Sequence, residues 1–233
     1  MELSNLERKL ESLRAFMDIE GLRKGLYTDK YFINIQQILA GLEKQTYNSI
    51  NQPLQHSSYD VSTAEVEMQV FTRRPGAVVC GIDFALACLK FCSGNWEDGN
   101  FVETSSDLEV WAVDDGEIIP YSGDPAYVTP VIKIHGRYKD FALNETLMLG
   151  YLSRASRIAT NVYELLQAAN GKPLLFFPAR YDIPEVQFLD GYAYRTAIHV
   201  YNQNHHTELQ PFISTDAQGL LFDRKGGGTI PHA

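Results

Sequence analysis

Hydrophobic residues recur at helical spacing in four stretches of the chain. Residues 3–24 carry leucine or methionine at every third or fourth position with charged residues between them, which predicts an amphipathic helix that ends at Gly25. A second helix is expected over residues 27–44, because a Thr-Asp capping signal stands near its start. Further helical patterns cover residues 139–169 and 183–202. The apolar stripe of the longest pattern consists of Phe141, Glu145, Met148, Leu152, Ala155, Ala159, Val162, Leu166 and Ala169.

One member of this stripe is unsuited to an apolar core. Glu145 carries a carboxylate, and burying it requires hydrogen-bond partners or a shift of its pKa. We expect a structural role in which Glu145 bonds to backbone groups or to an arginine, and a functional role is the alternative.

Strands are predicted in the segments between these helices. Residues 65–74 and 128–136 are rich in β-forming residues, and the first of them alternates between apolar and polar positions. Residues 78–92 continue through a glycine into a helix. Residues 108–121 place an Asp-Gly pair between two apolar runs, which predicts a hairpin with its turn at Asp115-Gly116.

The C-terminal part predicts the opening of an α/β barrel. The run LLFFPAR at 174–180 is typical of a buried parallel strand, and residues 211–221 and 226–233 are predicted as two further strand-plus-loop units. In such barrels the chemistry takes place at the carboxyl ends of the strands. The residues expected at these ends are Arg180, Ser214, Thr215, Asp216 and His232.

Composition narrows the class of protein. The chain has 233 residues, 45% of them hydrophobic, and a net charge of −9, which argues against a general nucleic-acid or anionic-membrane surface. No apolar stretch is long enough to span a bilayer and no signal peptide is expected. The cysteines Cys80, Cys88 and Cys92 form no disulfide framework, so a cytoplasmic location is expected. We predict that they are small buried residues and not metal ligands.

Several stretches, in their order along residues 26–233, resemble the nicotinate phosphoribosyltransferases. The most specific are the long-helix motif ending in ETLMLGYL and the terminal GTIPHA. The full set is YTDKY, VDDGEIIPYSGDP, VIKIHGRYKDFALNETLMLGYL, ASRIATN, FFPARYDIPEVQFLDGYAY and GGGTIPHA.

The resemblance implies an activity and a fold. The family couples nicotinate to 5-phosphoribosyl-1-pyrophosphate in NAD salvage, with Mg²⁺ on the pyrophosphate and ATP hydrolysis through a phosphorylated histidine. The implied fold class is α+β: a β-rich N-terminal domain with helices, followed by the opening strands and helices of an irregular α/β barrel. We therefore expect an N-terminal helix at 1–25, an α/β domain at 26–170, a partial barrel at 171–233, and a homodimer with a shared site.

Three residues carry family roles over to this sequence. Tyr31 matches the tyrosine that stacks on the nicotinate ring, and a core tyrosine is the alternative. Arg180 matches an arginine that binds carboxylate or phosphate, and a surface salt bridge is the alternative. His232 matches the phosphorylated histidine, and a loop histidine without a task is the alternative.

Phosphate contacts are implied at two further places. Thr160 matches the threonine of the family's Thr-Lys pair. Ser214 and Thr215 match a turn whose backbone N–H groups face phosphate.

The chain departs from the family pattern where cations are expected. Asn161 stands in place of the lysine of the Thr-Lys pair, and Tyr181 in place of a second arginine. Arg154, Arg157 or Lys172 are candidates to replace the missing charges.

The family also continues well past the histidine motif, so we expect a partial chain. A transferase for nicotinamide or quinolinate and a non-catalytic ligand-binding remnant are the alternative functions.

Overall fold

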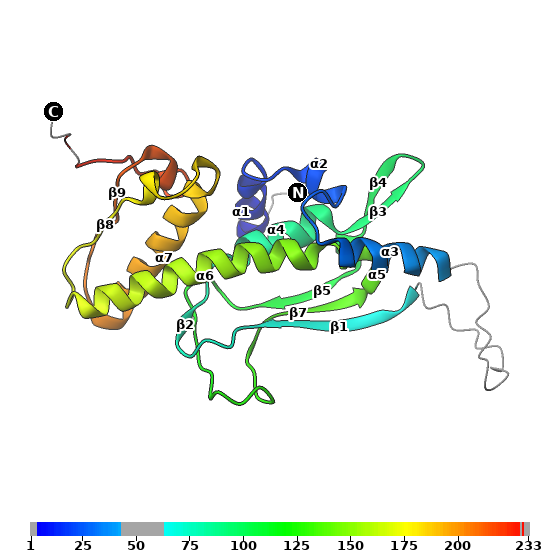
Figure 1. Ribbon diagram of the computed structural model, residues 1–233, viewed down its shortest axis with the longest axis horizontal. Coiled ribbons are helices and arrows are strands. Elements are labelled where there is room, and N and C mark those ends of the chain that lie inside the picture. The colour runs from blue at the N-terminus through cyan, green and yellow to red at the C-terminus, as the bar shows by residue number, and fades with distance from the viewer. Residues whose placement is uncertain (1–3, 43–62, 229, 231–233) are drawn as a thin grey trace. The chain divides into compact units, whose positions relative to one another are not determined.

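The computed structural model describes residues 4–42, 63–228 and 230 (Figure 1). The chain divides into two compact units, and each is described by itself. The first unit consists of Met1–Gln69, Asp83–Trp111 and Ile132–Gly150, and the second of Val70–Ile82, Ala112–Val131 and Tyr151–Ala233.

A three-stranded sheet is the central feature of the first unit. Its strands are β1 (Glu65–Phe71), β7 (Pro130–Arg137) and β5 (Glu109–Ala112), with β7 in the middle (Figure 1). Both flanking strands pair with β7, and the core side chains of β7 include Ile132 and Ile134. The strands predicted over 65–74 and 128–136 are confirmed.

A short hairpin in the first unit was not predicted from the sequence. Strands β3 (Gly94–Glu97) and β4 (Asn100–Glu103) pair antiparallel across a two-residue turn. The turn residues Asp98 and Gly99 both have positive φ, 47° and 81°. Asp-Gly is the favoured pair for such a turn, so this dipeptide was the signal that could have located the hairpin.

The N-terminal segment forms two helices, so the single helix predicted over 3–24 is wrong. Helix α1 (Asn5–Arg14) begins with a capping box at Ser4, and α2 (Ile19–Arg23) follows a short break. The break occurs because the Asp18 carboxylate caps α2, accepting a hydrogen bond from Gly21 N at 3.0 Å.

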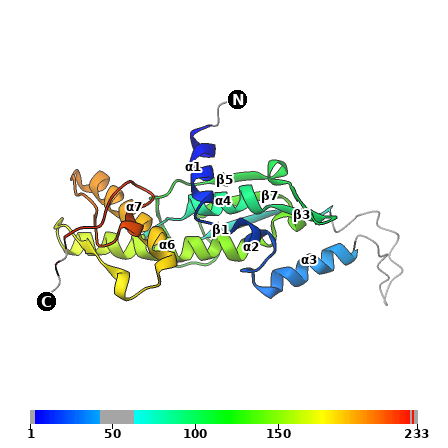
Figure 2. The ribbon, with the colours of Figure 1, turned by 90° about the horizontal axis from the view of Figure 1, so that it is seen from above.

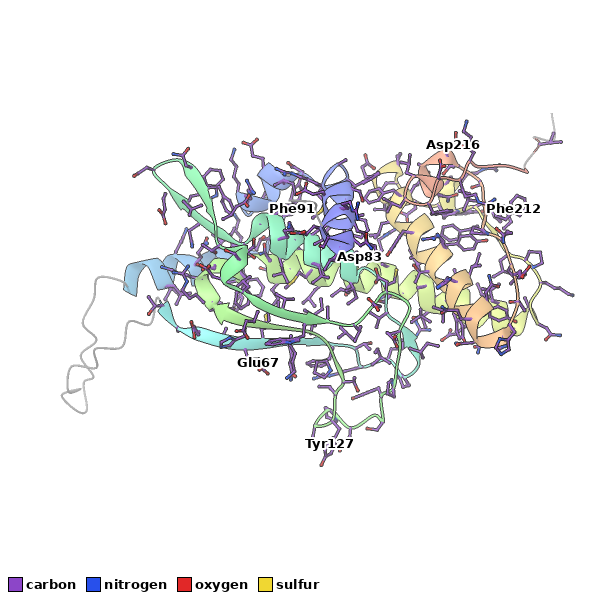
Figure 3. The ribbon with its side chains drawn as sticks, turned by 180° about the vertical axis from the view of Figure 1, so that it is seen from behind. Glu67, Asp83, Phe91, Tyr127, Phe212 and Asp216 are labelled. Carbon is purple, nitrogen blue, oxygen red and sulfur yellow. The ribbon has the colours of Figure 1, made fainter. Side chains whose placement is uncertain are left out.

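The remaining helices of the first unit match their predicted positions. Helix α3 spans Lys30–Leu42, and α4 spans Ile82–Cys92. Lys9 of α1 forms an ion pair with Asp83, which Figure 3 labels at the start of α4 together with Phe91 near its end. The Arg14 guanidinium lies 5.2 Å from the centre of the Phe91 ring. These contacts pack α1 against α4.

The three cysteines are buried free thiols, as the sequence predicts. Burial raises the pKa of Cys88 well above its usual value and that of Cys92 to about 11. Burial thus keeps the Cys88 and Cys92 thiols protonated, and a protonated thiol is a poor nucleophile.

The hairpin predicted over 108–121 is wrong, because its two halves pair with different strands. Strand β6 (Ile118–Ile119) pairs antiparallel with β2 (Ala77–Val78), while β5 joins the sheet of the first unit. Hydrogen bonds that involve the side chain and the backbone of the Asp115-Gly116 turn connect it to the chain that follows β2. Asp115 Oδ1 accepts from Ile82 N at 2.9 Å, and Gly116 N donates to Val79 O at 2.7 Å.

The longest helical pattern is confirmed, with a short helix before it. Helix α5 (Tyr138–Phe141) precedes α6 (Asn144–Ala168), which runs unbroken through 25 residues (Figure 2). The predicted stripe is buried over most of its length. Its fully or nearly fully buried members are Phe141, Met148, Leu152, Ala155, Ala159, Val162 and Leu166.

The C-terminal segment of the second unit is a strand–helix–strand unit. Strand β8 (Leu175–Phe176) lies parallel to β9 (Phe212–Ile213), and helix α7 (Gln187–His205) connects them. Tyr194 of α7 joins the two strands, because its hydroxyl donates to Leu174 O at 2.6 Å and accepts from Phe212 N at 3.0 Å. This is the parallel pair expected at the opening of an α/β barrel.

Short 3-10 turns complete the described elements: η2 (Ser105–Asp107), η3 (Pro178–Arg180), η4 (Pro184–Val186) and η5 (Asp216–Gly219). In the part of the chain that the structure describes, no helix is long and apolar enough to cross a membrane.

Candidate substrate site

The carboxyl ends of β8 and β9 lie at one edge of the strand pair. The register pairs Leu175 with Phe212 and Phe176 with Ile213, so the residues that follow both strands emerge at this edge. Arg180 follows β8 on η3, and Ser214 and Thr215 follow β9. The Arg180 side chain is exposed and makes no ion pair with any residue that the structure describes. The edge therefore holds a free guanidinium beside a polar turn.

The turn after β9 is closed by a buried glutamine. Gln218 Oε1 accepts hydrogen bonds from Ser214 N at 3.0 Å and from Thr215 N at 3.2 Å. Thr215 Oγ1 in turn donates to Gln187 Oε1 at 2.8 Å. The two N–H groups that the resemblance assigns to phosphate are thus occupied, and a phosphate would have to displace the Gln218 carboxamide to reach them.

The glycine run packs directly against this turn. Gly226 N donates to Asp216 Oδ1 at 2.8 Å, and Gly227 N donates to Ile213 O at 3.0 Å. A Cβ atom on Gly226 would lie only 2.7 Å from Thr215 N. Figure 3 labels Asp216 on η5 and Phe212 on β9. The glycines therefore allow close backbone approach, whereas His232 lies outside the described residues.

An ion-pair network fixes the segment that follows Arg180. Arg154 of α6 donates from Nε to Asp190 Oδ1 at 2.8 Å and from Nη2 to Asp190 Oδ2 at 2.9 Å. The same guanidinium also binds Asp182. The hydrogen bond from Ile183 N–H makes the largest contribution to lowering the pKa of the Asp182 carboxyl. The hydrogen bond and the charge of Arg154 lower this pKa further. Arg154 is therefore committed to two carboxylates and does not replace a missing substrate-binding cation.

The other two candidate cations, Arg157 and Lys172, are not tied up in ion pairs with described residues as Arg154 is. The side chains of Arg157 and Lys172 are exposed, and neither makes an ion pair within the described ranges. Both stay candidates for anion binding in the second unit.

Thr160 and Asn161 have structural partners. Thr160 is 1% exposed, and its hydroxyl donates to Ser156 O at 2.6 Å and accepts from Val78 N at 3.0 Å. This structure therefore gives the Thr160 side chain no open surface toward a substrate. Asn161 Oδ1 accepts from Arg74 Nη1 at 3.2 Å, and the same guanidinium pairs with Glu164 at 2.7 Å. Arg74 is a cation beside Asn161 that the sequence analysis missed, because 87 residues separate the two.

Tyr31 stands on the surface of the first unit, at the start of α3. Its side chain is 64% exposed, so the alternative of a core tyrosine is wrong. Two hydrogen bonds fix the start of α3 against the chain around the start of α6: Thr28 Oγ1 to Leu143 O at 2.9 Å, and Asp29 N to Thr146 Oγ1 at 3.3 Å. A flat aromatic face is therefore held open at a defined position.

Glu145 and Tyr138 lie close to this position. Glu145 is half-buried, and among the described residues its carboxylate has no hydrogen-bond or ion-pair partner. The expected bonds to backbone groups or to an arginine are therefore not formed within the described residues. Burial raises the pKa of Glu145. Burial also raises the pKa of Tyr138, with smaller contributions from the charges of Glu145 and Tyr31.

Comparison with known proteins identifies the fold. Residues 49–156 match the family described as quinolinate phosphoribosyl transferase, N-terminal domain. The structure resembles the nicotinate-nucleotide pyrophosphorylase from Pyrococcus furiosus with a TM-score of 0.64 and 23% identity, over 91% of this chain and 43% of that one. It also resembles the human nicotinic acid phosphoribosyltransferase with a TM-score of 0.58 and 19% identity, over 88% of this chain and 39% of that one.

These matches correct the family to which the sequence motifs pointed. The family that matches is the quinolinate one, so the assignment to the nicotinate phosphoribosyltransferases is wrong, and the quinolinate alternative fits better. The identities to these two solved structures are low, 23% and 19%. The chain spans less than half the length of either neighbour. It has the mixed helix-and-sheet fold of the nicotinate-nucleotide pyrophosphorylase from Pyrococcus furiosus over nine-tenths of its length.

Proposed function

We propose that this chain is part of a phosphoribosyltransferase of NAD biosynthesis that converts quinolinate to nicotinate nucleotide. The observation that carries the proposal is the match of residues 49–156 to the quinolinate family. The fold shared with a nicotinate-nucleotide pyrophosphorylase supports it.

The chemistry follows from the substrate and the product. The ring nitrogen of quinolinate forms a bond to the anomeric carbon of 5-phosphoribosyl-1-pyrophosphate, and the carbon–oxygen bond to pyrophosphate breaks. Pyrophosphate leaves with that electron pair. Quinolinate has two carboxylates and nicotinate nucleotide has one, so a carbon–carbon bond also breaks, carbon dioxide leaves, and a solvent proton takes its place on the ring. A site for this reaction has to bind a flat ring and several anionic groups.

The exposed side chains of the chain suit these two tasks. Tyr31 offers an open aromatic face for the ring. Arg180 offers a free guanidinium fork, which binds a carboxylate or a phosphate through two parallel hydrogen bonds. Ser214 and Thr215 would bind phosphate only after Gln218 releases their N–H groups.

The resemblance also implies Mg²⁺, for which the described residues offer no cluster of ligands. They contain no group of three or more histidine, cysteine, aspartate or glutamate side chains that could hold a metal ion. We therefore assign no step to the ion, and Mg²⁺ bound to the pyrophosphate of the donor stays a prediction. ATP-assisted turnover of nicotinate is not part of the proposal.

The test is turnover by the complete protein that contains this chain. Purified protein is incubated with 5-phosphoribosyl-1-pyrophosphate, Mg²⁺ and either quinolinate or nicotinate, and nicotinate mononucleotide is measured by chromatography and mass spectrometry. The proposal expects product from quinolinate without ATP. An R180Q variant should retain the fold and lose most of this activity. Absence of product with every pyridine acid would support the non-catalytic remnant instead.

A further inference from the structure

An exposed aromatic face and a carboxylate without a partner in the described part of the chain share one corner of the first unit. The hydrogen bonds from Thr28 to Leu143 and from Asp29 to Thr146 join the start of α3 to the chain around the start of α6 (Figure 1). Tyr31 lies two residues after Asp29, and Glu145 immediately precedes Thr146. The two side chains are thereby held on neighbouring helix ends.

The Glu145 carboxylate, in the first turn of α6, has no hydrogen-bond or ion-pair partner among the described residues. Charged groups removed from water normally have an ionic or hydrogen-bonding partner, and within the described residues Glu145 has neither. Burial raises the pKa of Tyr138, and the charges of Glu145 and Tyr31 raise it further, so these three groups lie near one another. The corner thus combines an exposed aromatic face with a carboxylate that has no ion-pair partner among the described residues, and both features attract a flat organic cation.

The proposed reaction produces such a cation. When the ring nitrogen gives its lone pair to the anomeric carbon, the ring becomes a pyridinium with a positive charge that the free pyridine acid lacks at neutral pH. A site that binds the pyridinium more tightly than the neutral ring stabilises the bond-forming transition state, in which this charge develops.

We propose that Tyr31 and Glu145 form a binding surface for the ring in its cationic, N-substituted form, with Glu145 as the group that recognises the positive charge. The inference rests on the proposed function, since it concerns the same pyridine ring. Binding a cation there would also remove the cost of holding Glu145 ionised and half-buried, because an opposite charge favours the ionised form.

Two ligands that differ mainly in this charge test the inference. Nicotinate has a neutral ring nitrogen at pH 7.5, and N-methylnicotinate carries a permanent positive charge there. Their dissociation constants are measured by calorimetry for the wild-type protein and for three variants: E145Q, E145D and E109Q. Glu109 is an exposed glutamate of strand β5 and serves as the matched control.

The expected result is a preference of the wild-type protein for N-methylnicotinate that E145Q lowers about tenfold, as the loss of one close charge pair would do. E145D, which keeps the charge, should restore part of the preference, and E109Q should match the wild type. Thermal unfolding of each variant confirms that it is folded.

Two outcomes would overturn the inference, and they differ in what they say of the function. If both ligands bind and E145Q leaves their ratio unchanged, Glu145 does not recognise the charge and the proposed function stands. If the folded wild-type protein binds neither ligand nor quinolinate, the proposed function fails and this inference fails with it.

Discussion

Removal of Arg154 should destabilise the second unit, because it would leave a buried carboxylate without its partner. The Asp190 side chain is only 2% exposed, and both of its oxygens accept hydrogen bonds from Arg154 at 2.8 and 2.9 Å. Hydrogen bonds to charged groups contribute about 1.5–3 kcal/mol each. Breaking a buried ion pair typically costs about 3–5 kcal/mol. Because the guanidinium is 35% exposed, we expect a loss near the lower limit, about 3 kcal/mol, for R154Q.

The assay is urea denaturation of the wild-type protein, R154Q and the double variant R154Q/D190N, followed by circular dichroism at neutral pH. D190N removes the charge that R154Q leaves unpaired, so the double variant should regain part of the lost free energy of unfolding. R157Q alters an exposed arginine of the same helix and should have little effect. A loss below about 1 kcal/mol for R154Q would refute the reasoning, because the network would then contribute no more than an exposed ion pair.

Three further predictions concern the two candidate binding surfaces. G226A should destabilise the protein by about 1–3 kcal/mol in urea denaturation, because the new Cβ would lie 2.7 Å from Thr215 N, whereas G227A meets no atom within 4 Å and should be tolerated. R180Q should weaken quinolinate binding about tenfold or more in calorimetry without lowering the thermal midpoint, and a fall in the midpoint would show that Arg180 has a structural partner. Burial raises the pKa of Glu145 above its usual 4.5, so the folded state holds this proton more tightly than the unfolded state. The contribution of Glu145 to the free energy of unfolding should therefore fall as pH rises through that range, and E145Q should remove this part of the pH dependence in denaturation series from pH 4 to 7.

The spacing of apolar residues predicted most of the long helices and strands. The predictions failed where a side-chain carboxylate caps a helix. The stripe of α6 is buried as expected because one apolar face of a long helix leaves little choice of orientation. The N-terminal helix broke at Asp18, whose carboxylate bonds to Gly21 N, a local contact that apolar spacing does not reveal. The hairpin prediction at Asp115 failed because this carboxylate caps α4 at Ile82, far away in sequence.

The sequence predicted those parts of the candidate site that lie at strand ends or are exposed aromatic side chains. The parallel pairing of β8 and β9 brings Arg180 and the Ser214–Thr215 turn to one edge, as the strand order suggested. The sequence did not reveal that Gln218 occupies the turn, because a buried glutamine has no signature in a pattern of apolar positions. Nor did it show that Glu145 finds no partner in residues 4–42 and 63–228, since the presence of a partner depends on tertiary packing.

The most direct test of quinolinate turnover follows the carboxylate that the reaction must lose. Quinolinate labelled with ¹³C in the carboxylate next to the ring nitrogen is given to the complete protein together with 5-phosphoribosyl-1-pyrophosphate and Mg²⁺. The account predicts labelled carbon dioxide and unlabelled nicotinate mononucleotide in equal amounts, dependent on the ribosyl donor and independent of ATP. Labelled quinolinate that is recovered intact, while nicotinate is converted under the same conditions, would contradict it.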